Sequence, residues 1–122
     1  MNVLIVDDEL EALELYSDVF YNYGIETVLF DNALDALNYL RKNQVNAIVS
    51  DIVMPECDGF EFFNRLKKEG LLADIFVFMT GAWKEEFQPK LQEGIHMIFH
   101  KPFSPEGLAL YLVNQKKTDK AL

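Results

Sequence analysis

The sequence predicts an α/β fold: a doubly wound sheet of five parallel strands with helices on both faces. Two observations predict this class. Five short apolar runs alternate with segments of helical periodicity, and the first run, Asn2–Val6, is continuous, as in strands buried on both faces. The short joining segments make each helix a crossover between parallel strands. The 122 residues suffice for one domain with its own core.

The predicted strands and helix starts follow along the chain in order. The apolar runs are 2–6, 26–30, 47–50, 75–79 and 95–99. Asp31 or Asn32 is suited to cap the second helix, and Asp58 precedes the third. We expect a single domain over residues 1–122, in which 115–122 form a frayed tail or the start of a linker.

The two helices nearest the carboxyl terminus have unusual compositions. Residues 83–93 are expected to be helical, but Pro89 lacks an N–H group and costs about 3 kcal/mol in a helix interior. We therefore expect a short, irregular or late-starting helix, with Pro89 in its first turn as one arrangement. The last helix begins with Ser104 as its cap. It is apolar nearly all the way round over 108–113, so its outer face is expected to contact a partner.

The order 2-1-3-4-5, the flavodoxin-like arrangement, is the common solution for five such strands. Ligands bind beyond the carboxyl ends of these strands, where the winding reverses, which here is between the first and third strands. Asp7 and Asp8 follow the first strand, and Asp51 follows the third. Thr80 and Lys101 follow the fourth and fifth, so five polar side chains are expected at one edge.

Each of these residues also has a purely structural explanation. Asp7 or Asp8 could cap a helix, a role worth about 0.5–2 kcal/mol, and Lys101 could be solvated. Together, however, three carboxylates repel one another, and one lysine leaves a deficit of two charges. This deficit indicates a divalent cation, and all-oxygen ligands favour Mg²⁺ over Ca²⁺ or Zn²⁺. Such an ion would bridge the site to a phosphoryl group, with the central carboxylate, Asp51, as nucleophile.

Over essentially its whole length the chain resembles the response-regulator receiver domains of two-component phosphorelay systems, in particular chemotaxis regulators. The matching motifs are Val6-Asp7-Asp8-Glu9, Asp51-Ile52-Val53-Met54-Pro55 with Asp58-Gly59, Thr80-Gly81, and Lys101-Pro102-Phe103. The resemblance implies a conformational switch and not an enzyme, since such a domain catalyses only its own phosphorylation and dephosphorylation.

The resemblance also implies a role for each site residue. Asp51 would accept a phosphoryl group from the phosphohistidine of a sensor histidine kinase or a phosphotransfer protein. Thr80 and Lys101 would contact that group, and the Lys101–Pro102 peptide would be cis, which only about 5–6% of X–Pro bonds are. The implied Mg²⁺ ligands are Asp7, Asp8, Asp51 and the backbone carbonyl of Val53.

A readout surface is expected on the fourth helix, fifth strand and last helix, with contacts to an effector or a second copy of the chain. Its expected residues are Trp83, Ile98, Leu110 and Tyr111. Receiver domains usually carry Tyr or Phe three residues before the lysine, where this chain has Ile98, with Phe99 on the opposite strand face. Either a smaller aliphatic repacking replaces the aromatic movement, or the coupling to the surface is altered.

Composition and missing motifs argue against other classes. The net charge of −9 opposes direct binding to nucleic acid, and no apolar run approaches the roughly 20 residues of a membrane span. A single cysteine, Cys57, fits a reducing cytoplasm. The alternative hypothesis is a receiver-fold interaction or dimerisation module that works without phosphorylation. A Mg²⁺-dependent phosphatase would need an Asp-x-Asp pair at Asp51, and a flavin protein a phosphate loop after the first strand.

Overall fold

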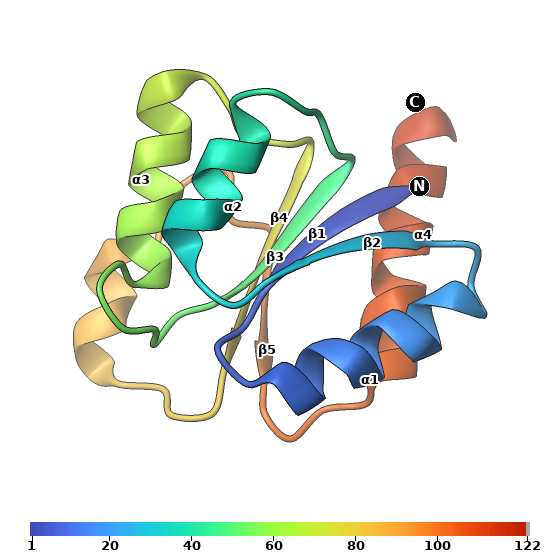
Figure 1. Ribbon diagram of the computed structural model, residues 1–122, viewed down its shortest axis with the longest axis horizontal. Helices are drawn as coiled ribbons and strands as arrows, with labels where there is room; N and C mark the ends of the chain where they lie inside the picture. Colours follow the sequence, from blue (N-terminus) through green and yellow to red (C-terminus); the bar gives the residue numbers. More distant parts are fainter. Residues whose placement is uncertain (122) are drawn as a thin grey trace.

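In the computed structural model, five strands form one parallel sheet in the order β2-β1-β3-β4-β5, which confirms the predicted fold (Figure 1). The structure describes residues 1–121, and side chains up to residue 115. The strands are β1 (Asn2–Val6), β2 (Glu26–Phe30), β3 (Ala47–Asp51), β4 (Ile75–Thr80) and β5 (Met97–His100).

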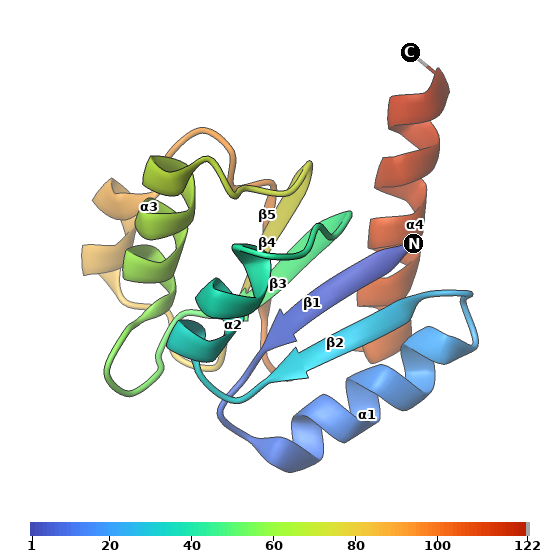
Figure 2. The same cartoon turned by 45° about the horizontal axis from the view of Figure 1, so that its top comes forward.

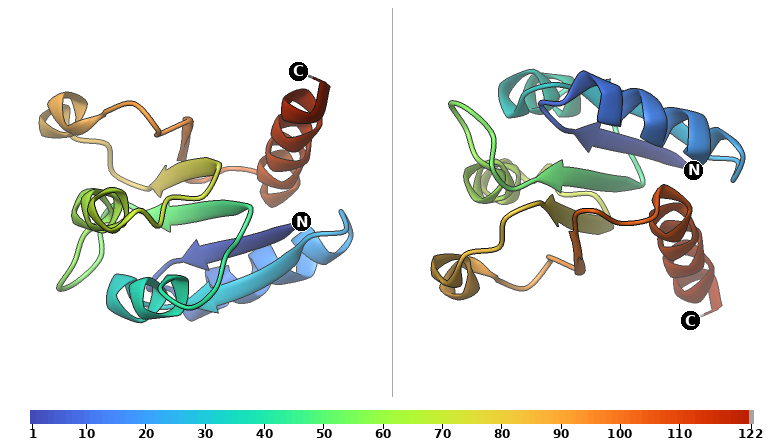
Figure 3. Two further views of the ribbon diagram at one scale, coloured as in Figure 1. Left: turned by 90° about the horizontal axis from the view of Figure 1, so that it is seen from above. Right: turned by 90° about the horizontal axis from the view of Figure 1, so that it is seen from below.

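The helices cover the sheet on both faces, so that the molecule has three layers (Figures 2 and 3). The helical elements are α1 (Leu10–Tyr21), α2 (Ala33–Leu40), α3 (Gly59–Glu69), the 3₁₀ helix η1 (Glu85–Lys90) and α4 (Pro105–Ala121). One face carries α1 and α4, and the opposite face carries α2, α3 and η1. No helix among the described residues is long and apolar enough to cross a membrane.

Two apolar cores lie on either side of the sheet because successive strand residues point to opposite faces. In β1, Val3 and Ile5 enter the core beneath α1 and α4, whereas Leu4 and Val6 enter the core beneath α2 and α3. All four side chains are fully buried. This two-sided burial is the reason that the first strand reads as a continuous apolar run.

Short polar side chains and one glycine fix the helix ends. Asn32 caps α2, its side-chain oxygen accepting a hydrogen bond from the Asp35 N–H at 2.9 Å. Asp58 caps α3 in the same way at 2.9 Å, with Glu61 as donor. Gly70 ends α3 in the left-handed conformation at a φ of 71°. The capping residues predicted for these helices are therefore confirmed.

The segment between β4 and β5 departs most from a regular helix. It forms only the 3₁₀ helix η1, which starts late, as predicted, at Glu85. Pro89 is the fifth of its six residues, so the arrangement with Pro89 in the first turn is wrong. Its missing N–H and bulky ring are tolerated here because this tight helix ends at the next residue, Lys90. Phe87 is buried and anchors η1 to the α2–α3 core.

The last strand and the last helix differ in detail from their predicted limits. β5 begins at Met97 and not at Ile95. The residue before it, His96, is bonded to Phe76 through both its backbone and its side chain. Its N–H donates to the Phe76 carbonyl at 2.8 Å, and its Nδ1 accepts from the Phe76 N–H at 3.1 Å. The backbone of α4 is helical to Ala121. Side chains from 116 onwards lie outside the described residues, so a frayed tail or linker over 115–122 stays a prediction.

Candidate acidic site at the carboxyl edge of the sheet

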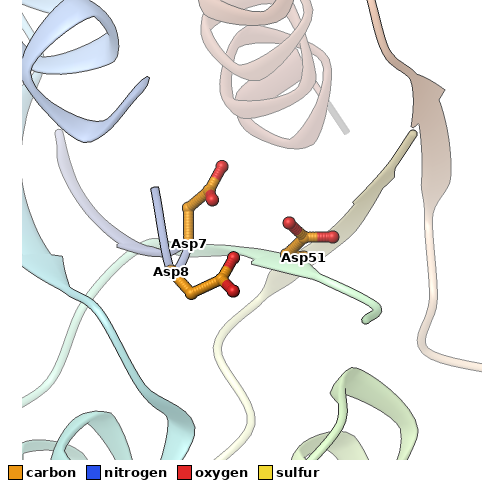
Figure 4. A group of neighbouring side chains, drawn as sticks. All are labelled: Asp7, Asp8 and Asp51. Carbon is orange, nitrogen blue, oxygen red and sulfur yellow. The ribbon is translucent and has the colours of Figure 1, made fainter. Parts of the chain in front are cut away.

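The sheet register brings the predicted acidic residues together. Val6, the last residue of β1, pairs with Ser50 of β3, so the next residues, Asp7 and Asp51, lie side by side at the same edge. Asp7, Asp8 and Asp51 each offer a carboxylate oxygen within 4.8 Å of the others (Figure 4). Asp7 and Asp51 are buried, whereas Asp8 is exposed. The cluster therefore has two buried acids and one that opens to solvent.

Lys101 is the cation of this cluster. Its Nζ donates to Asp7 Oδ2 at 2.9 Å and to Asp51 Oδ2 at 3.0 Å. Its backbone N–H donates to the Thr80 carbonyl at 2.8 Å, which ties the end of β5 to the end of β4. The Lys101–Pro102 peptide bond is cis, as the resemblance implied.

Charge and burial compete at the acid pair. Burial raises the pKa of the Asp51 carboxyl; hydrogen bonding and charge from Lys101 oppose this rise, and the negative charges of Asp7 and Asp8 add to it. Burial would lower the pKa of the Lys101 ammonium, but its hydrogen bonds to the two buried acids outweigh that effect and raise it. Lys101 is thus kept protonated, whereas the ionisation of Asp51 is opposed by its burial.

The oxygen atoms of the acidic cluster form a donor set that suits a divalent cation. Three ionised carboxylates and one ammonium leave a net charge of −2, and the two lone pairs of each oxygen are not used up by Lys101. All-oxygen donors with one side open to water suit Mg²⁺. The acidic residues therefore fit such an ion. Val53 lies in the loop after β3 with its side chain 52% exposed, and a role for its carbonyl stays a prediction.

Thr80 belongs to the same edge. Asp51 pairs with Met79 of β4, and Thr80 is the next residue, buried, at the end of that strand. Its hydroxyl accepts a hydrogen bond from the Ala82 N–H at 3.2 Å. The structure therefore gathers all five residues predicted for this edge. Lys101 contacts Asp7 and Asp51 directly, and the Thr80 carbonyl accepts a hydrogen bond from the backbone of Lys101.

A close approach of α3 and a buried tyrosine are site features that the sequence did not reveal. A Cβ on Gly59 would lie 2.5 Å from the Asp51 carbonyl oxygen, so only glycine lets α3 begin so close to β3. Tyr16 of α1 stacks on Phe103 at a centroid distance of 5.9 Å. Burial, opposed by Lys101 and reinforced by Asp7, raises the pKa of Tyr16 to about 12. Its inward-facing position was predictable from helical spacing, but its nearness to the acids was not.

The residues expected to form a readout surface lie on both sides of β5. Trp83 and Ile98 pack against the α2–α3 core, whereas Tyr111 packs against the α1–α4 core. Trp83 contacts Phe87 edge-on, with centroids 5.4 Å apart, so it serves as a packing anchor for η1. Leu110 is 48% exposed on α4. Their role in readout stays a prediction.

Comparison with known families agrees with this geometry. A family model described as the response regulator receiver domain matches residues 3–112. The chain belongs to the receiver domain family. Receiver domains are signalling modules of two-component systems, partner with histidine kinases and are generally non-enzymatic. In this receiver domain the acidic cluster of Asp7, Asp8 and Asp51 is of the kind typical of the family's Mg²⁺ site.

Individual relatives of the receiver domain are of several kinds. The sensor histidine kinase RcsC of Salmonella typhimurium is 30% identical over 122 residues, covering 97% of this chain but 13% of RcsC. The response regulator SaeR of Staphylococcus aureus is 30% identical, covering 93% of this chain and 49% of SaeR. The chemotaxis response regulator CheY4 of Vibrio cholerae has a TM-score of 0.81 at 25% identity, covering 93% of this chain and 96% of that one. The chain thus spans less than half of either curated relative.

Proposed function

We propose that this receiver domain accepts a phosphoryl group on Asp51 from the phosphohistidine of a sensor histidine kinase or phosphotransfer protein, and acts in the cytoplasm as a conformational switch. The observation that carries the proposal is the bridge from Lys101 Nζ to Asp7 and Asp51, at 2.9 and 3.0 Å, inside a cluster of three acids. Membership of the receiver domain family supports the same conclusion.

The carboxylates of Asp7, Asp8 and Asp51 would hold Mg²⁺, with the carbonyl of Val53 as a further ligand. When bound, the ion supplies positive charge that offsets the negative charge developing on the phosphoryl oxygens during transfer. A further positive charge comes from the chain itself. Lys101 keeps one positive charge at the acid pair, and its raised pKa means that it stays protonated throughout the physiological range.

The proposed transfer is a displacement at phosphorus. An oxygen of the ionised Asp51 carboxylate forms a new P–O bond, the P–N bond to the donor imidazole breaks, and its electron pair stays on that nitrogen. No proton leaves Asp51, so the buried acid must already be ionised, which Lys101 favours by hydrogen bonding to it. Thr80, at the end of the neighbouring strand, would donate its hydroxyl hydrogen to a phosphoryl oxygen.

Phosphorylation by a small donor tests this proposal. The protein is incubated with acetyl phosphate and Mg²⁺, and its intact mass is recorded. We expect a gain of one phosphoryl group in the wild type and in Asp74→Asn, an exposed acid that precedes β4 at the opposite end of the sheet. We expect none in Asp51→Asn, nor in the wild type with a chelator.

The outcomes of this experiment separate the two candidate functions. A mass gain that persists in Asp51→Asn would assign the modification elsewhere and overturn the proposed acceptor. No gain in the wild type with several phosphodonors would favour the phosphorylation-independent interaction module. That alternative draws its support from Ile98, which stands where receiver domains usually carry an aromatic ring.

A further inference from the structure

Consecutive residues of β5 enter different cores. Ile98 packs against the core beneath α2 and α3, whereas Phe99 packs against the core beneath α1 and α4. The strand that leads to Lys101 therefore carries an aliphatic side chain on one face and an aromatic ring on the other. The ring of Phe99 has neighbours that connect it both to the acidic site and to the outside of the domain.

Four rings form a continuous series on the α1–α4 side of the sheet; we call Tyr16, Phe103, Phe99 and Tyr111 the aromatic series. Tyr16 and Phe103 are stacked, with planes 8° apart. Phe103 meets Phe99 edge-on at a centroid distance of 5.4 Å, and Phe99 meets Tyr111 edge-on at 5.6 Å. These are favourable arrangements of ring pairs, so a shift of one ring is costly unless its neighbour follows.

The inner end of the aromatic series is tied to the acidic site. Tyr16 is buried, and the charges of Lys101, Asp7 and Asp51 all act on it. Phe103 follows Lys101 by two residues, and the residue between them is a proline whose ring fixes φ. Because proline fixes one of the few backbone torsions between them, the positions of Lys101 and Phe103 are closely linked.

The outer end of the aromatic series reaches the surface of α4. Tyr111 is partly buried against the core, and its neighbour Leu110 is 48% exposed. On the other side of β5, His100 contacts Trp83 at a centroid distance of 5.8 Å, and Trp83 contacts Phe87, so Ile98 lies beside this line of rings and not in it. Of the two neighbours on β5, Phe99 and not Ile98 therefore belongs to a line of ring contacts that runs from the residues around Lys101 to α4.

We propose that the aromatic series, and not Ile98, carries the state of Asp51 to the outer surface of α4. The inference rests on the proposed function, because phosphorylation is the change to be carried. A phosphoryl group brings about −1.5 to −2 charges and three acceptor oxygens to the site, so Lys101 must rearrange its hydrogen bonds. Its movement shifts Phe103 between Tyr16 and Phe99, and packed rings respond by changing between discrete arrangements.

Fluorine NMR of fluorotyrosine-labelled protein tests the inference. The resonance of Tyr111 is assigned with Tyr111→Phe, and spectra are recorded before and after addition of Mg²⁺ and beryllofluoride, a phosphoryl mimic. We expect this addition to displace the Tyr111 resonance in the wild type. Phe103→Leu, which alters a ring that contacts Phe99, is expected to reduce the displacement to less than about half. Ile98→Val is the matched control on the opposite face of β5. It is expected to leave the displacement of the Tyr111 resonance unchanged.

The same samples are weighed intact after acetyl phosphate treatment, so that the two proposals fail separately. No mass gain in the wild type would overturn the proposed function and with it this inference. A normal mass gain with full Tyr111 displacement in Phe103→Leu, or with displacement lost in Ile98→Val, would overturn the inference alone.

A reciprocal measurement does not depend on the folding of the Phe103 variant. Coupling between two sites acts equally in both directions, so a change at the outer end must alter binding at the acidic site. Tyr111→Leu is expected to change the beryllofluoride affinity about fivefold or more, which is the usual lower range of such coupling. Leu15→Ala, an exposed apolar residue of α1 outside the aromatic series, should leave the affinity unchanged. Equal affinities for Tyr111→Leu and the wild type would overturn the inference.

Discussion

Asp51 is a buried carboxylate with more negative neighbours than positive ones. Lys101 divides its hydrogen bonds between Asp51 and Asp7, and Asp8 adds a third negative charge nearby. Burial raises the pKa of Asp51 because desolvation penalises its ionised form. Asp51 is therefore the residue best placed to react. Its ionised form also lowers the folding stability as long as no cation is bound.

Neutralising this residue should stabilise the metal-free protein. Asn is nearly isosteric with Asp, and its carbonyl still accepts a hydrogen bond from Lys101. We expect Asp51→Asn to raise the free energy of unfolding by about 1 kcal/mol at neutral pH, or roughly 4 °C in Tm for a domain of this size. The measurement is thermal unfolding with a chelator. Asp74→Asn, an exposed acid at the far end of the sheet, should leave Tm nearly unchanged.

The pH dependence of this gain has a definite sign. Because the folded pKa of Asp51 is raised above its ordinary value of 3.8, the folded state binds the proton more tightly than the unfolded state. The contribution of Asp51 to stability is therefore most favourable at low pH and is lost as pH rises through its folded pKa. The gap in Tm between Asp51→Asn and the wild type should widen over that interval; a gap that narrows with rising pH would contradict this explanation.

The regular elements were predictable from the sequence, whereas their irregular joints were not. Strand β1 reads as a continuous apolar run because both of its faces are buried, and α3 is bracketed by Asp58 and Gly70. The start of β5 depends instead on a tertiary contact between His96 and Phe76. Glu56, in the loop after β3, has a positive φ of 68° with no glycine to indicate it. Such features depend on packing that local sequence does not encode.

The start of α3 shows how one element positions the site. Gly59 lies against β3, where an added Cβ would lie 2.5 Å from the Asp51 carbonyl oxygen and 2.9 Å from the Phe78 ring. Both neighbours are held in place, one by the backbone and the other by full burial. We expect Gly59→Ala to destabilise the domain by about 1–3 kcal/mol, as overpacked substitutions do, and to slow phosphorylation by acetyl phosphate because Asp51 is displaced.

Gly107 is the matched control for this prediction. It lies in the first turns of α4, and an added Cβ would meet Ser104 at 3.6 Å, an ordinary contact. Alanine is favoured over glycine in a helix by about 0.5–1 kcal/mol, so Gly107→Ala should stabilise the domain slightly. Urea unfolding of both variants measures the two effects. Equal stability of Gly59→Ala and the wild type would mean that α3 can move away from β3 without cost.

At the scale of the whole molecule, topology explains why the candidate site was predictable. Once the strand order is 2-1-3-4-5, residues far apart in the chain, such as Asp7 and Lys101, must meet at one edge. The way in which Lys101 divides its hydrogen bonds could not be derived, because it depends on side-chain geometry. Neither could the stacking of Tyr16 on Phe103, since α1 and the loop before α4 are joined only by the tertiary fold.

The whole domain, with its net charge of −9, should be stabilised by Mg²⁺ through the acidic site. A ligand that binds only the folded state stabilises it by about 1.4 kcal/mol at ten times its Kd, or roughly 5–6 °C in Tm here. We expect this rise in the wild type and in Asp74→Asn, compared with NaCl at equal ionic strength. Asp8→Asn should largely lose it while folding normally, because Asp8 is exposed. If Asp8→Asn kept the full rise, Mg²⁺ would be acting on the overall negative charge and not at this site.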